Sequence, residues 1–95
     1  MKNYVLIKII DRSSVYDLFN QTDAKLYGSL EDAKEGLKNE VNKMLMQITD
    51  TNIKNGNLDD MEMEDLVEVT QNNENFVTIH DLDEDCYYNY LIKEV

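Results

Sequence analysis

Apolar and polar positions alternate along the first segment of the chain. Residues 3–11 read NYVLIKIID, in which Val5, Ile7 and Ile9 lie at period two on one face of an extended backbone. The residues between them are also largely apolar. A strand that is apolar on both faces is typical of a sheet interior covered at least partly on both sides. We therefore predict a central strand here.

Shorter apolar runs predict four more strands. Residues 15–19 form a second strand, which we expect to pair antiparallel with the first, and the polar residues 20–23 form a loop. In the second half of the chain, residues 66–70, 76–80 and 86–95 are rich in valine, isoleucine and tyrosine, and polar turns separate them.

An apolar stripe at three- and four-residue spacing predicts one long helix. Ser29 is a typical N-cap, and Asp32 follows three residues later as an approximate capping box. The stripe consists of Leu30, Ala33, Leu37, Val41, Met44, Leu45 and Ile48. The turn-rich sequence that follows predicts that the helix ends near Thr49. Gly36, inside the helix, indicates a place where another backbone comes close.

The predicted element order is β-β-α-β-β-β. Because an antiparallel sheet buries one face most economically under a helix, we expect an α+β fold with one long amphipathic helix packed on a face of the sheet. With 95 residues, of which 42% are hydrophobic, the chain has the size and composition of a single domain that spans residues 1–95.

Charge divides the chain into two halves. Residues 1–54 carry eight acidic and eight basic side chains, whereas residues 55–95 carry twelve acidic side chains and one basic one, Lys93. The second half therefore accounts for the whole net charge of −11. Such a charge repels free nucleic acid and anionic membranes, and it favours basic surfaces as partners.

No constellation of residues indicates catalysis. Cys86 and His80 are the only cysteine and histidine, and they form no recognised zinc spacing. No serine or cysteine has the base and orienting group that a nucleophile needs, and no glycine-rich phosphate loop occurs. We predict a non-enzymatic protein with no catalytic residues, no metal site and no cofactor.

One partial motif leaves an alternative open. Asn55, Asn57, Asp59 and Glu62 match the second half of an EF-hand loop around Gly56. The first half of the loop lacks its carboxylates. The residues Asp81 to Asp85 resemble the start of a calcium loop but lack its glycine and its final glutamate. A calcium-responsive module is thus the alternative hypothesis, beside a small protein-interaction domain of another kind.

Two features of the sequence predict the cellular compartment of the protein. The apolar stretch at residues 5–10 is too short to span a bilayer or to act as a signal peptide. A single cysteine is typical of a reducing environment. We expect a cytoplasmic protein.

The acidic half supplies the predicted partner-binding residues. Carboxylates at alternate strand positions repeat every ~6.6 Å and imitate the charge ladder of a nucleic-acid backbone. Tyr87 and Tyr88 point to opposite faces of the last strand, so one of them is available to a partner. The predicted partner-binding residues are Asp59, Asp60, Glu62, Glu64, Asp65, Glu68, Asp81, Asp83, Glu84, Asp85 and Tyr87.

The organisation of the chain is similar to that of a known group. The segments YVLIKIID, LYGSLEDAKEGLKNEV and YNYLIKEV, in a chain rich in Lys, Asn, Asp and Ile, resemble small proteins of phages and mobile elements in low-GC bacteria. The acidic members of that group resemble anti-CRISPR and anti-restriction inhibitors, several of which mimic DNA. The resemblance covers organisation and composition, so it transfers no functional residue. It implies an inhibitor that occupies the basic nucleic-acid-binding surface of a partner, such as a CRISPR effector or a restriction enzyme, in the host cytoplasm.

Overall fold

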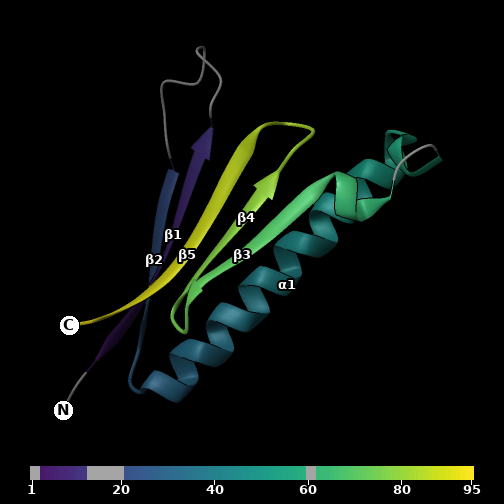
Figure 1. Cartoon of the computed structure of the whole chain (residues 1–95). Helices are drawn as coiled ribbons and strands as arrows, with labels where there is room; N and C mark the ends of the chain where they lie inside the picture. The colour runs from purple at the N-terminus through teal and green to yellow at the C-terminus, as the bar shows by residue number, and fades with distance from the viewer. Residues whose placement is uncertain (1–2, 13–20, 60–61) are drawn as a thin grey trace.

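A five-stranded antiparallel sheet and one long helix form the molecule (Figure 1). The computed structural model describes residues 3–12, 21–59 and 62–95. Its elements are β1 (Tyr4–Arg12), β2 (Gln21–Tyr27), α1 (Leu30–Lys54), two short 3₁₀ helices, η1 (Asn57–Asp59) and η2 (Met63–Asp65), β3 (Val67–Asn73), β4 (Phe76–Asp81) and β5 (Cys86–Glu94). The strand order is β2-β1-β5-β4-β3, and all neighbours are antiparallel. The predicted α+β class and element order are confirmed.

The strand that pairs with β1 is not where the sequence pattern placed it. The predicted strand at residues 15–19 lies outside the described residues. The prediction of a loop at residues 20–23 is wrong for Gln21 to Asp23, which begin β2 and pair with β1 from Tyr4↔Tyr27 to Ile10↔Gln21. Because β2 is an edge strand, backbone pairing with β1 is enough to hold a polar segment that has little strand propensity.

Helix α1 begins as predicted. The Asp32 backbone N–H donates to the Ser29 hydroxyl oxygen at 3.1 Å. The helix then runs to Lys54, five residues past the predicted end, because buried Asn52 satisfies its own polar group. Its amide nitrogen donates to the Ile48 carbonyl at 2.9 Å. Asparagine is a poor helix former mainly because its side chain can hydrogen-bond to backbone groups in non-helical conformations. Here the Asn52 side chain bonds to a backbone carbonyl of the same helix, so it does not end the helix.

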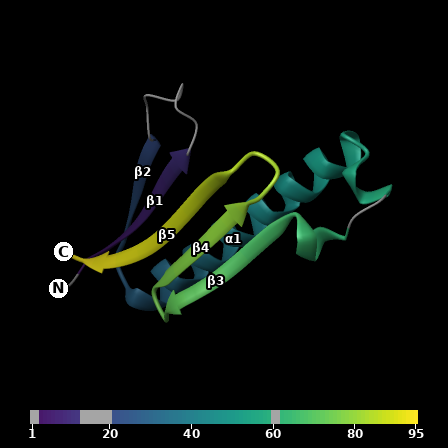
Figure 2. The ribbon, with the colours of Figure 1, turned by 45° about the horizontal axis from the view of Figure 1, so that its top comes forward.

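The helix covers one face of the sheet, which we call the helix face (Figure 2). The buried core between the two layers includes Leu6, Ala33, Leu37, Met44, Ile48, Val77, Ile79, Cys86, Tyr88, Tyr90 and Ile92. Most of the predicted helix stripe therefore faces the core. The opposite face of the sheet, the open face, carries Val5, Ile7 and Ile9 at half-buried positions. No described helix or strand lies over it, so among the described elements only α1 covers β1, on the helix face.

Gly36 does mark a close approach, but of a side chain rather than a backbone. A Cβ at this position would lie 2.6 Å from Cζ of Tyr27, well inside contact distance. The absent side chain lets the Tyr27 ring pass against the first turns of α1, close to the chain termini. This contact fixes the start of the helix against the edge strand β2.

Within the described part of the chain, no helix is long and apolar enough to cross a membrane.

Candidate partner-binding surface

The two acidic segments of the sequence meet at one end of the sheet. The Leu82 backbone N–H donates to the Leu66 carbonyl at 3.0 Å, just beyond the β3–β4 pair Val67↔Asp81. This bond places η2 and the start of β3 beside the turn between β4 and β5. We call residues 62–68 and 81–85 the acidic end; in Figure 1 it lies away from the two chain termini. The convergence arises from strand order, since β4 lies between β3 and β5.

Asp81 shapes the turn from inside. The residue is 6% exposed, and its Oδ1 accepts hydrogen bonds from the backbone N–H groups of Asp83 at 3.2 Å and of Glu84 at 3.4 Å. Asp85 closes the turn with φ 51°, a left-handed conformation that aspartate tolerates better than most residues. Asp81 was predicted to bind a partner, but the structure places it as a structural carboxylate that holds the other acids of the turn outward.

His80, on the open face of β4, lies between two carboxylates, Glu68 of β3 and Asp85 of the turn before β5. Its Nε2 lies 3.1 Å from Oδ1 of Asp85, and its Nδ1 lies 3.8 Å from Oε2 of Glu68. The imidazole stacks on the Tyr87 ring with centroids 4.0 Å apart and planes 8° apart. Sheet register brings these groups together, because Glu68 pairs with His80 and His80 with Tyr87. The sequence pattern singled out Glu68, Asp85 and Tyr87 but not their histidine link.

The remaining carboxylates of this region are open to solvent. Exposed side chains are those of Asp59, in η1 ahead of the acidic end, and of Glu62, Glu64, Asp65, Glu68, Asp83, Glu84 and Asp85. The predicted residue Asp60 lies outside the described residues. The sequence holds no lysine or arginine from residue 55 to residue 92, so no neighbour along the chain neutralises the cluster. Its field therefore extends outward over about a Debye length, ~8 Å at physiological salt.

The tyrosines of β5 divide between the two faces as predicted. Tyr87 is half-buried on the open face, whereas Tyr88 and Tyr90 are buried under α1. Burial raises the pKa of Tyr90 and, together with a hydrogen bond to Cys86, the pKa of Tyr88 well above the usual value near 10. Both phenols therefore stay neutral in the core. Of the two neighbours, Tyr87 is the one placed beside the carboxylates.

The residues of the partial calcium motif have other roles in the fold. Asn55 is the C-cap of α1, and the Asn57 amide donates to Oδ1 of Asn52 at 2.8 Å. Glu62 precedes η2, which leads into a strand rather than a second long helix. Among the described residues, no group of three or more histidine, cysteine, aspartate or glutamate side chains is placed to hold a metal ion.

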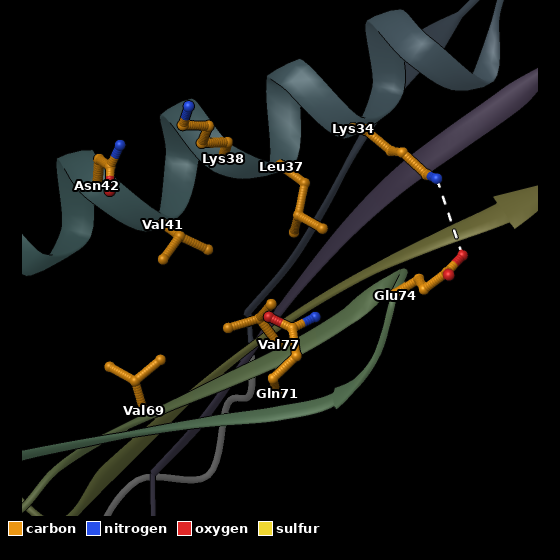
Figure 3. Close-up of a pocket in the computed structure, with 9 residues that line it drawn as sticks. All are labelled: Lys34, Leu37, Lys38, Val41, Asn42, Val69, Gln71, Glu74 and Val77. Atoms are coloured by element: carbon orange, nitrogen blue, oxygen red, sulfur yellow. Dashed lines mark ion pairs between the residues drawn. The ribbon is translucent and has the colours of Figure 1, made fainter.

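A groove that the sequence did not reveal runs between α1 and β3 (Figure 3). It encloses about 460 Å³, and the side chains of Leu37, Val41, Val69 and Val77 face each other across it. An ion pair between Lys34 and Glu74, 3.9 Å long, bounds one end. The groove lies where α1 faces the edge strand β3 and its neighbour β4.

Comparison of the chain with models of protein families, with curated proteins and with solved structures finds no match.

Proposed function

We propose that the protein is a non-enzymatic inhibitor whose acidic end occupies the basic nucleic-acid-binding surface of a partner protein. The observation that carries this proposal is the hydrogen bond between Leu82 and Leu66, because it joins two acidic segments that are separate in the sequence. The result brings the exposed carboxylates of two segments together, and neither segment contains a lysine or an arginine. Proteins that bind nucleic acid present the complementary surface, lysine and arginine side chains spaced to meet phosphates.

Order within the patch supports a role in binding rather than in solubility alone. Asp81 fixes the turn from below, and His80 lies between Asp85 and Glu68. Carboxylates held in place before contact lose less conformational entropy on binding than free side chains do. Tyr87 adds an aromatic surface next to the charges, and aromatic residues are enriched at interfaces.

Inhibition would follow from competition. The acidic end attracts the basic surface over several ångströms, which makes association fast and sensitive to salt. Once bound, its carboxylates take the place of phosphates, and the partner can no longer hold DNA or RNA. This scheme is the one that the resemblance to anti-CRISPR and anti-restriction DNA mimics implies, and it needs neither a cofactor nor a reaction.

The test is capture of partners on the immobilised protein at low and at high salt. We expect a DNA- or RNA-binding protein to be retained at low salt and released at high salt. The purified partner is then titrated with labelled nucleic acid in the presence of increasing amounts of the protein. Loss of nucleic-acid binding in proportion to complex formation is the expected result.

Two variants of equal charge locate the interface. D83N/E84Q/D85N removes three carboxylates from the acidic end, and asparagine suits the left-handed backbone at position 85. E31Q/E35Q/D50N removes three exposed carboxylates from α1. We expect the first variant to lose at least about tenfold in affinity and the second to keep nearly all of it. Equal losses in both, or a partner that still binds nucleic acid in the complex, would refute the proposal.

A further inference from the structure

Strand β3 lies at the edge of the sheet, and its unpaired edge carries few charges. One of its sides pairs with β4, and the other has no partner strand among the described residues. Val69, at its middle, is 50% exposed and opens onto the groove beside α1. Edge strands usually carry charges that prevent pairing with another chain. The other edge, β2, follows that rule with Asp23 and Lys25, whereas the regular part of β3 holds one charge, Glu68.

We propose that two copies of this chain pair through β3, antiparallel, across a two-fold axis at Val69. A bulge between Gln71 and Asn73 ends the regular part of the strand, so the free ladder runs from Val67 to Gln71 and Val69 is its centre. In this register Val67 lies opposite Gln71 of the second copy and Glu68 lies opposite Thr70. No carboxylate faces another within the ladder, which removes the repulsion that like-charged cross-strand pairs cause.

The same axis explains the groove. An axis normal to the sheet places both α1 helices on one side of the joined sheet, so the two grooves face each other. The two Val69 side chains then meet on the axis, between the Val41 side chains of the two helices. Val69 and Val41 already line one groove in the single chain. Pairing removes this apolar surface from water, the usual driving force for association.

The pairing also sets which parts of the two helices face each other. Because the two copies of α1 run antiparallel, the half that carries Lys34 and Lys38 lies toward the half of the other copy that carries Met46 and Asp50. Met46 is 67% exposed in the single chain. The acidic ends lie on opposite sides of the axis and point away from each other, so most of the net charge stays outside the interface. Val67 and Glu68 of each acidic end enter the ladder, whereas residues 62–66 and 81–85 stay outside it. The pairing does not depend on the proposed inhibitor role.

Mass in solution over a concentration series tests the pairing. By light scattering or sedimentation, we expect the full chain to reach twice the 11.1 kDa of one chain. V69K places two ammonium groups on the axis and is expected to stay monomeric. The matched control is L26K on the other edge strand, where Leu26 is 62% exposed; it is expected to associate like the unchanged chain. A monomer at every concentration, or a V69K variant that still pairs, would overturn the inference.

A cross-link supplies a second measurement that does not require V69K to fold. Cysteines opposite each other on antiparallel strands lie within reach of a disulfide, and the native Cys86 is buried. V69C is expected to form a covalent dimer on mild oxidation, whereas L26C is expected to remain largely monomeric. Equal cross-linking of both variants would show random collision instead of pairing through β3.

Discussion

At the end of the molecule where the chain termini lie, helix α1 touches the sheet closely, whereas at the acidic end turns and hydrogen bonds join the elements. At the end with the termini, Ala33 is fully buried and the Tyr27 ring packs against Gly36. At the acidic end the connections are polar, from Asp81 to its turn and from Leu82 to Leu66. The helix start thus relies on a close side-chain contact, whereas the acidic turn relies on polar bonds that leave Asp83 and Glu84 exposed.

The largest expected effect is at the packed end. G36A inserts a methyl group into the space of the Tyr27 ring, and we expect a loss of about 1–3 kcal/mol in the free energy of unfolding. Urea denaturation of G36A, Y27A and the double variant measures it. In the Y27A background, where the ring is absent, G36A is expected to stabilise the helix by up to about 1 kcal/mol. A loss of equal size in both backgrounds would mean that the contact with Tyr27 is not the cause.

A smaller effect is expected from the carboxylate inside the acidic turn. D81A removes the acceptor of two backbone N–H groups, and we expect it to cost about 1–2 kcal/mol. D81N keeps an acceptor oxygen and is expected to lose less. The control is D83A, which changes an exposed neighbour in the same turn. If thermal or urea denaturation gives the same result for D81A and D83A, Asp81 does not organise the turn.

The smallest expected effect is on two charge variants, whose free energies of unfolding should change in opposite directions. D83N/E84Q/D85N relieves repulsion at the acidic end and is expected to raise the free energy of unfolding by up to about 0.5 kcal/mol at low salt. E31Q/E35Q/D50N is expected to lower it by a similar amount, because Glu31 lies at the positive end of the helix dipole and Glu35 lies one turn from Lys38. Added salt should shrink both differences. The same sign in both variants would remove the contrast between the two ends.

Local patterns in the sequence predicted most elements of the fold. The strand β1, the start of α1 and the three strands of the acidic half lie close to their predicted positions, because each has a clear period or cap. Strand β2 was missed since its polar residues Gln21, Thr22 and Asp23 follow no apolar alternation. The pairing with β1 that holds them is a non-local interaction.

The candidate surface was predicted only as a set of residues. Which acids are exposed depends on the turn, and nothing in the sequence separates Asp81, which is buried, from Asp83, which is not. Likewise, His80 joins Glu68 to Asp85 only because β4 lies between β3, which carries Glu68, and β5, which Asp85 directly precedes. The groove beside β3 depends on the angle of the helix across the sheet, and no local pattern encodes that angle.

The elongated shape of the molecule gives the charge distribution a further consequence. The chain measures 51 × 28 × 21 Å, and its acidic end lies away from the termini. Such a particle has a large electric dipole moment as well as a net charge. A positively charged surface therefore exerts a torque on it, in addition to an attraction, and turns it before contact. The protein should reach a basic partner with its acidic end in front. Fewer collisions then occur in an orientation that cannot lead to binding.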